Sequence, residues 1–316
     1  MSMNKRIYGI IGIVSKMANW NADFSGFPKT TSEGQIFASD KALKYPMKKM
    51  WNDMGLPILY LKSLRFSSNV DGMLIPRSLT EKYEQLFDTP DLKAVTNIKE
   101  VITNLFSITD VKQFGATFTE SGKNISITGA VQIGQGFNLY EDTVVEEQQI
   151  LSPFRDASKD GKKTEGVEAM NSTIGSKIIS DEAHYFYPFN INPNAYREFV
   201  ELGVTEGYTE EDYQLFKQVA ISSVTSFATN SKMGCDNEFT LFVETEPTVY
   251  LPSLVPNVRF KKGYDGEKNV IEVHLGNVAD KQGIKNIEIY YNVDTTIIET
   301  DAQNVKYFNI FTKAEV

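Results

Sequence analysis

The apolar run at residues 7–14, Ile-Tyr-Gly-Ile-Ile-Gly-Ile-Val, constrains the fold more than any other segment. Its β-branched side chains favour extended backbone, and the run is too short to cross a membrane as a helix. A short apolar run of this kind is typical of a core strand. We therefore predict that residues 7–14 form a buried strand.

A polar loop at residues 19–29, Asn-Trp-Asn-Ala-Asp-Phe-Ser-Gly-Phe-Pro-Lys, follows this strand. It carries two amides, a carboxylate, a Trp, a Gly and a Pro. Loops positioned by a rigid core strand commonly bind ligands. The same Asn, Asp, Gly and Pro residues are also ordinary turn formers. These residues alone leave both interpretations open, a binding loop or a long connection from a strand to a helix.

Composition limits the classes of protein that remain. A chain of 316 residues with 41% apolar and 12% aromatic residues has enough material for a packed core. A single cysteine, Cys235, excludes an internal disulfide and a cysteine-cluster metal site. The two histidines, His184 and His274, lack the spacing of metal ligands. We expect no metal, no cofactor and no membrane segment, and without a signal-peptide pattern a cytoplasmic protein.

The charge of the chain is distributed unevenly. Residues 1–66 carry ten Lys and Arg against four Asp and Glu, a net charge of +6, whereas the remainder carries 22 against 37. The whole chain therefore has a net charge of −9, which argues against general binding to nucleic acid. A local basic excess beside the polar loop is nevertheless compatible with one polyanion-binding groove.

The pattern of apolar residues predicts a mixed, α+β domain. Expected helices cover residues 40–54, 79–88, 97–106 and 209–225, and expected strands cover residues 7–14, 58–66, 184–191, 239–244, 270–275, 287–291 and 306–311. This order resembles an elaborated βαββαβ unit, the plan of RNA-recognition motifs and ferredoxin-like folds. We predict one elaborated domain over residues 1–316, with inserted helical and hairpin subdomains at about 67–110 and about 137–172.

Catalytic motifs are not recognisable in the sequence. It contains no G-x-S-x-G, Walker A, H-E-x-x-H or kinase pattern. The stretch Asp-Glu-Ala-His at residues 181–184 is either an acid–base or metal cluster or a turn that leads into a strand, and we favour the turn. We therefore predict no catalytic residue and no enzyme.

Two further blocks are compatible with nucleic-acid binding. Glycines at the end of the apolar stretch 126–134 permit a ligand backbone to approach closely, although the same glycines occur at β-bulges. Aromatic residues at 184–187 can stack bases, as they do in RNA-binding sheets, but such alternation more often marks core packing.

In combination, these blocks resemble one known family. They occur in the order N-W-N-A-D-F-S-G-F-P-K at 19–29, S-D-K-A-L-K at 39–44, F-G-A-T-F at 114–118, S-I-T-G-A-V-Q-I at 126–133, D-E-A-H-Y-F-Y at 181–187 and N-I-N-P at 190–193. The chain resembles the repeated backbone subunit of the type I CRISPR surveillance complex (Cascade), in particular its subtype I-B branch, within the RAMP superfamily of RNA-binding proteins. The resemblance covers roughly residues 6 to 245.

The resemblance implies an antiviral-defence protein with a modified RNA-recognition-motif fold. Copies of such a subunit polymerise head-to-tail into a helical filament along the CRISPR guide RNA, together with other Cascade subunits. The subunit holds the guide's backbone, and pairing between the guide and target DNA supplies sequence specificity. A protruding hairpin inserts between nucleotides at regular intervals, and a separate helicase-nuclease cuts the target.

The resemblance also implies which side chains contact the RNA backbone. We expect these to be Ser15, Asn19, Asn21, Lys29, Lys41, Lys44, Lys48, Lys49, Gln132, Gly134 and Lys177. Helical spacing places Lys41, Lys44 and Lys48 on one helix face, where they form either a ladder of phosphate contacts or an ordinary solvated surface.

Asp23 supports an alternative function. Related backbone subunits of type III complexes cut target RNA with a loop aspartate, and Asp23 lies in a comparable loop. The alternative is therefore a metal-dependent RNase subunit of a type III-like complex. Because the surrounding residues match the branch that does not cleave, we expect Asp23 to organise the loop.

Overall fold

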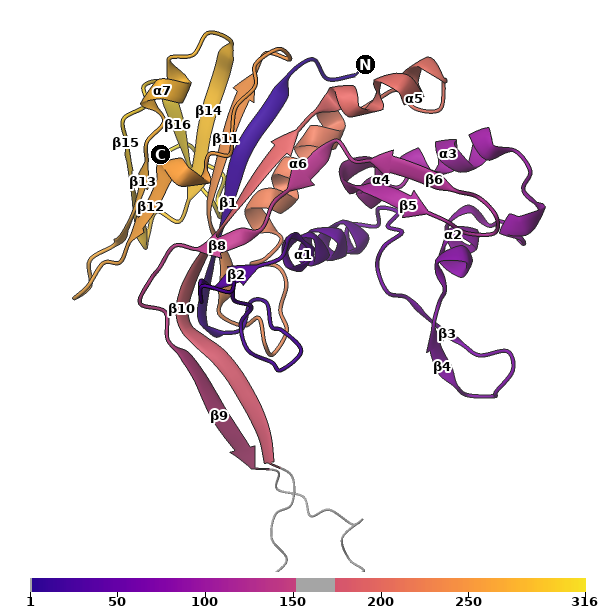
Figure 1. Cartoon of the computed structure of the whole chain (residues 1–316), viewed down its shortest axis with the longest axis horizontal. Coiled ribbons are helices and arrows are strands. Elements are labelled where there is room, and N and C mark those ends of the chain that lie inside the picture. Colours follow the sequence, from indigo (N-terminus) through magenta and orange to yellow (C-terminus); the bar gives the residue numbers. More distant parts are fainter. Residues whose placement is uncertain (1, 152–173) are drawn as a thin grey trace, which may run out of the picture.

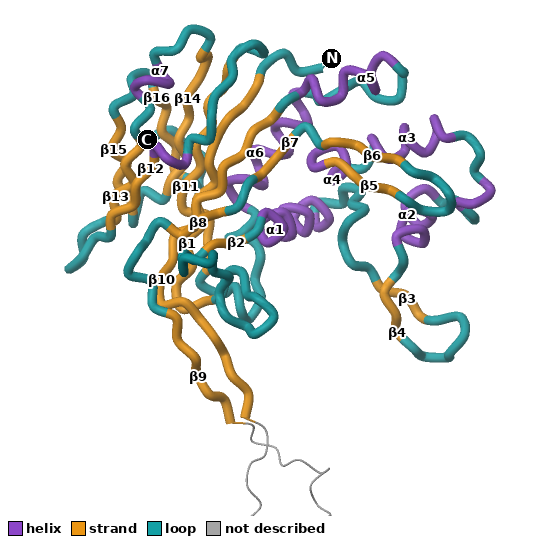
Figure 2. The backbone as a smooth tube through the Cα atoms, in the orientation of Figure 1, coloured by secondary structure: helices purple, strands orange, loops and turns teal. Residues whose placement is uncertain are grey.

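The computed structural model describes residues 2–151 and 174–316, and its centre is a nine-stranded sheet (Figures 1 and 2). In spatial order the sheet runs β16 (Val305–Asn309), β14 (Ile284–Tyr291), β11 (Cys235–Thr245), β1 (Arg6–Ala18), β10 (Ile174–Ile191), β8 (Gly136–Asn138) and β2 (Phe37–Ala38). Two further strands, β7 (Val131–Ile133) and β9 (Val145–Leu151), also pair with β10. The predicted combination of helices and sheet is confirmed.

Strand β1 is the middle of this sheet and is antiparallel to both neighbours, β10 and β11. Ile7 and Ile11 belong to one buried cluster, whereas Tyr8 and Ile10 belong to a second. Successive side chains of a strand point to opposite faces, so both faces of β1 are covered. The predicted buried strand at 7–14 is therefore confirmed, and it continues to Ala18.

Helices cover one face of the sheet. α1 (Asp40–Asp53) and α6 (Glu210–Ser222) contact one another and carry buried side chains, including Trp51 and Phe216, into the first cluster. α6 begins with a reciprocal capping box between Thr209 and Asp212, as its acidic first turn favours. The short helix α5 (Arg197–Glu201) precedes it, after the 3₁₀ turn Pro193–Tyr196.

A second, smaller sheet covers the opposite face. It consists of β12 (Val258–Lys261), β13 (Asn269–Val273) and β15 (Thr296–Thr300), and α7 (Gly276–Ala279) follows β13. Ile271 and Val273 of this sheet share a buried cluster with Ile10, Phe186 and Leu241 of the central sheet. Neither face of the central sheet is therefore open at its centre.

The segment between α1 and β7 forms a separate lobe beside the helices (Figure 1). It contains β3 (Leu64–Phe66), β4 (Leu74–Pro76), α2 (Leu79–Phe87), α3 (Ile98–Phe106), α4 (Thr109–Phe114), β5 (Gly115–Phe118) and β6 (Ile125–Thr128), with a 3₁₀ turn at Leu92–Ala94. The helices predicted at 79–88 and 97–106 are confirmed as α2 and α3. The predicted insertion at about 67–110 falls inside this lobe.

The strand predicted at 58–66 is wrong. Only its end, β3, is a strand, and β3 pairs with β4 rather than with the central sheet. The carboxylate of Asp110 instead accepts hydrogen bonds from the backbone N–H groups of Leu59, at 2.8 Å, and Tyr60, at 2.9 Å. A buried side chain thus takes the place of a neighbouring strand, which a sequence pattern does not reveal.

The first helix begins at Asp40, as the predicted range of 40–54 has it, and ends at Asp53. Ser39 occupies its N-cap position. Pro46 lies inside α1 without ending it.

The longest strand, β10, extends beyond the body of the molecule. Its first part pairs with β9 from Ile174 to Ser180, and its second part pairs with β1. The resulting β9–β10 hairpin projects from the body (Figure 1). The predicted insertion at about 137–172 includes β9, but its part from 152 onward lies outside the described residues.

We predict that Asp110→Ala destabilises the lobe. The substitution leaves two backbone donors without their acceptor, and an unsatisfied buried donor costs roughly 1–3 kcal/mol. Urea unfolding should show this loss, and Asp110→Asn, which keeps one acceptor oxygen, should lose less. An alanine variant as stable as the wild type would contradict this role of Asp110.

Candidate nucleic-acid interface

The polar loop after β1 is held in place by its own side chains. The Asp23 carboxylate accepts hydrogen bonds from the backbone N–H groups of Ser25, at 2.8 Å, and Phe27, at 3.1 Å. The Asn21 side-chain oxygen accepts from the backbone N–H and the hydroxyl of Ser39, at 2.8 and 3.0 Å. Asp23 therefore organises the loop, as expected, and Asn21 fastens the loop to the start of α1.

Asn19 joins the loop to the root of the projecting hairpin. Its side-chain N–H₂ donates to the carbonyl oxygen of Gly26, at 2.8 Å, and to that of Ile178 in β10, at 3.2 Å. Asn19 is only 7% exposed, so it positions the loop from inside. Its amide oxygen is buried without a hydrogen-bond partner in the described structure.

Lys232 supports the same loop from a distant part of the sequence. Its ammonium group donates to the carbonyl oxygen of Asn19, at 2.6 Å, and to that of Trp20, and it lies 5.4 Å from the centre of the Trp20 ring. Burial lowers the pKa of Lys232. Sequence reasoning missed this residue because 213 positions separate it from Asn19 and no local motif marks it.

Three of the predicted lysines remain available for a ligand. Lys29 lies in the loop, Lys41 in the first turn of α1, and Lys177 in β10 next to Ile178. None of the three forms an ion pair or a side-chain hydrogen bond with the residues that the structure describes. The loop contacts both the start of α1 and the root of the hairpin in β10, so these regions of the sequence lie next to the loop.

The other lysines of α1 are engaged within the protein. Lys44 pairs with Asp40 at 2.9 Å, and Lys49 pairs with Asp53. The Lys48 ammonium donates to the Tyr60 carbonyl oxygen at 2.8 Å, and burial lowers the pKa of Lys48. The placement of these residues does not support a ladder of phosphate contacts along the helix. Part of the local charge of +6 is compensated from outside residues 1–66, because Lys5, Lys16 and Arg65 pair with glutamates elsewhere in the chain.

Three more predicted residues lie elsewhere. The Ser15 side chain is fully buried and donates to the Ala18 carbonyl oxygen at 3.3 Å, so its placement does not support RNA contact. Gln132 and Gly134 line a cleft of about 330 Å³ together with Tyr8 and Asn190. Because Gln132 pairs with Asn190, near the opposite end of β10 from Lys177, this cleft is separate from the loop.

The aromatic block at 184–187 belongs to the core. Tyr185 and Tyr187 lie in the cluster beneath the helices, whereas Phe186 lies in the cluster beneath the second sheet. All three are 0–1% exposed. The hypothesis that these aromatic residues stack bases is therefore wrong, because both faces of the sheet are covered.

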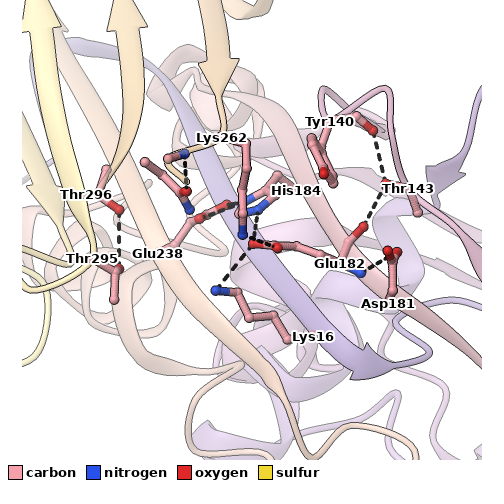
Figure 3. A network of polar contacts seen from close by, with 12 residues as sticks. Lys16, Tyr140, Thr143, Asp181, Glu182, His184, Glu238, Lys262, Thr295 and Thr296 are labelled. Atoms are coloured by element: carbon pink, nitrogen blue, oxygen red, sulfur yellow. Dashed lines mark hydrogen bonds and ion pairs between the residues drawn. The ribbon is translucent and has the colours of Figure 1, made fainter. Parts of the chain in front are cut away.

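A buried network of charges lies at the root of the hairpin (Figure 3). Both oxygens of Glu238 lie 2.8 Å from His184 Nδ1, and Glu182 Oε1 lies 3.0 Å from His184 Nε2. An ionised carboxylate only accepts hydrogen bonds, so a carboxylate at each ring nitrogen favours the imidazolium form of His184. Glu182 also pairs with Lys262 and, at 3.3 Å, with Lys16.

The network shifts the pKa values of its members. Burial alone would lower the pKa of His184, but Glu238 and Glu182 together raise it. Burial would raise the pKa of Glu182, but its bonds to His184 and Lys262 and the charge of Lys16 lower it to about 2. The cluster at 181–184 is thus an ion network within a strand. Among the described residues, no group of three or more His, Cys, Asp or Glu side chains could hold a metal ion.

Comparison with known proteins identifies the family. The family model described as CRISPR-associated protein Cas7 matches residues 5–279. Because the match covers most of the chain, the chain belongs to the Cas7 family. No curated protein matches the chain. No helix of the described chain is long and apolar enough to cross a membrane.

Solved structures share the fold. A chain of a "CRISPR RNA-guided surveillance complex, pre-nicking" has a TM-score of 0.52 and 13% identity, over 94% of this chain and 96% of that chain. A chain of a "CRISPR RNA-guided surveillance complex" has a TM-score of 0.51 and 13% identity, over 95% of each. The resemblance predicted from the sequence is confirmed at the level of the family.

We predict that the His184 network makes stability depend on pH. A raised pKa means that the native protein holds its proton more tightly than the unfolded chain, whose histidine pKa is about 6.5. The stabilisation is therefore complete below about pH 6.5 and is lost as the pH rises through the native pKa of His184, by at most about 1.4 kcal/mol per pH unit. On the acidic side, the contribution of Glu182 is complete above its ordinary pKa of 4.5 and is lost progressively as the pH falls to its native pKa of about 2.

Denaturant unfolding between pH 5 and pH 9 measures how the free energy of unfolding depends on pH. NMR titration of the two histidine rings shows which histidine causes this dependence. The double variant His184→Gln/Glu238→Gln removes both the titrating ring and the carboxylate that it faces, so its stability should be flatter above pH 6.5. A wild-type protein whose stability rises steadily from pH 6.5 to pH 8 would rule out the imidazolium.

Proposed function

We propose that this chain is the guide-RNA-binding backbone subunit of a type I, subtype I-B, CRISPR surveillance complex in the cytoplasm. The observation that carries the proposal is one surface of this Cas7-family chain. There, the organised loop at 19–29, which carries Lys29, meets the start of α1, which carries Lys41, and the root of the projecting hairpin, which carries Lys177. Lysines that pair with no acidic side chain among the described residues suit a phosphate backbone.

The topology supports a modified RNA-recognition-motif core. Along the chain, β1, α1, β8, β10, α6 and β11 follow the order βαββαβ, and these strands are neighbours in one sheet. In this core the second sheet covers the face on which an open motif would stack bases. RNA is therefore held at the end of the sheet, where the loop and the hairpin project, rather than on its face.

The remaining parts of the role follow from assembly. Copies associate head-to-tail along the guide. A contact between two different surfaces that does not close into a ring produces a filament. The guide is thereby presented for pairing with target DNA, and pairing supplies specificity. The structures of similar fold come from RNA-guided surveillance complexes, which supports partnership with guide RNA and other subunits.

We predict that Lys29→Ala/Lys177→Ala weakens binding of single-stranded RNA and reduces its salt dependence. Each phosphate contact contributes about 0.7 to the slope of log affinity against log salt, so losing two should lower the slope by about 1.4. Fluorescence anisotropy over a salt series measures the slope. Lys44→Ala/Lys49→Ala is the matched control, because both side chains already pair with aspartates. If the two double variants reduced the salt slope equally, Lys29 and Lys177 would not be the residues that contact phosphates.

We also predict that the subunit does not cut RNA. The Asp23 carboxylate bonds the backbone of its own turn, an organising role that requires no catalysis. Protein loaded with guide should leave complementary labelled RNA intact with magnesium on a denaturing gel. Cleavage by the wild type that disappears in Asp23→Ala would instead establish the RNase alternative.

A further inference from the structure

Exposed aromatic side chains are few and lie away from the covered faces of the sheet. Among the described residues, the large aromatic side chains that are exposed are Phe24, Phe27, Tyr45, Phe66, Tyr250, Tyr264 and Phe311. Phe24 is the most exposed of them, at 112% of the reference value, and Phe27 is 42% exposed. Both belong to the loop that carries Lys29.

The turn that presents Phe24 is held by a dense set of hydrogen bonds. The Asp23 N–H donates to the Phe27 carbonyl oxygen at 2.7 Å, and the Gly26 N–H donates to the Asp23 carbonyl oxygen at 3.3 Å. The Asp23 carboxylate adds two further bonds, and Gly26 adopts a φ of 90°, which suits a residue without Cβ. Phe24 thus stands on a fixed backbone with its ring in solvent.

The position of the turn relates Phe24 to the proposed RNA path. Asn19 ties the carbonyl groups of Gly26 and Ile178 together. A Cβ added to Gly26 would lie 3.2 Å from the Ile178 side chain, so the turn packs directly against the root of the hairpin. Phe24 therefore lies in the same loop as Lys29 and beside Ile178 at the root of the hairpin.

We propose that Phe24 is a base-stacking residue, which receives an unpaired base of the single-stranded nucleic acid whose phosphates the neighbouring lysines hold. The proposal rests on the proposed function and extends it from backbone contact to a stacking contact. Stacking accepts any base because every base has a π-face, so the contact adds affinity without selecting a sequence. A phenylalanine fixed on a rigid turn also loses little conformational freedom on binding.

Full-length protein and a fluorescein-labelled single-stranded RNA of mixed sequence provide the test. Phe24→Ala should weaken binding roughly 5- to 150-fold, the range that corresponds to losing one stacked base. The salt slope should stay unchanged, because no phosphate contact is lost. Phe24→Trp should retain affinity, and Phe311→Ala, an exposed phenylalanine near the C-terminus, should behave as the wild type. The Phe24 ring is exposed, so thermal unfolding should not change.

Phe24→Leu separates stacking from a general apolar contact. Leucine keeps apolar surface without a π-face, so it should bind as weakly as alanine; full affinity in this variant would overturn stacking in favour of an apolar contact. An RNA with 2-aminopurine at successive positions should show a stacked base in the wild type that is released in Phe24→Ala. If the wild type binds RNA and Phe24→Ala binds equally well, only this inference fails. If the wild type binds no RNA, the proposed function itself fails.

Discussion

Burial of β1 on both faces is the constraint on which the rest of the structure depends. Helices α1 and α6 cover one face, and the C-terminal sheet covers the other. Close packing leaves little room at the strand: a Cβ on Gly9 would lie 2.1 Å from the Leu241 carbonyl oxygen. Because both faces are occupied, the proposed RNA interface lies at the end of the sheet, at the loop that leaves β1 and the hairpin that extends β10.

The interface combines elements that are distant in sequence through polar side chains of the loop. Asn19 donates to a carbonyl oxygen of β10, and Asn21 accepts from the N-cap residue of α1. Lys232 donates to the carbonyl oxygens of Asn19 and Trp20. Asn19 and Asn21, which the sequence suggested as RNA contacts, thus shape the loop together with Lys232. Under the proposed function, the groups left for a ligand are those that form no side-chain hydrogen bond or ion pair among the described residues, chiefly Lys29, Lys41, Lys177 and Phe24.

The sequence predicted most of the core and less of the site. Runs such as 7–14 and the capped helix at 209–225 carry their own local signals, so their type was predictable. The error at 58–66 has a non-local cause, because the buried Asp110 carboxylate satisfies backbone groups that a strand would otherwise satisfy. In the same way, Lys44, Lys48 and Lys49 resemble a phosphate-binding face until their partners Asp40, Tyr60 and Asp53 are placed beside them.

The continuity of β10 has a mechanical consequence. Its 18 residues, at about 3.3 Å each, span roughly 60 Å from the projecting hairpin to the centre of the sheet without an intervening loop. A hairpin joined to the core by a loop could rotate about that loop. Here one strand, β10, forms both a side of the hairpin and a strand of the core sheet. A load applied to the hairpin is therefore transmitted to the core.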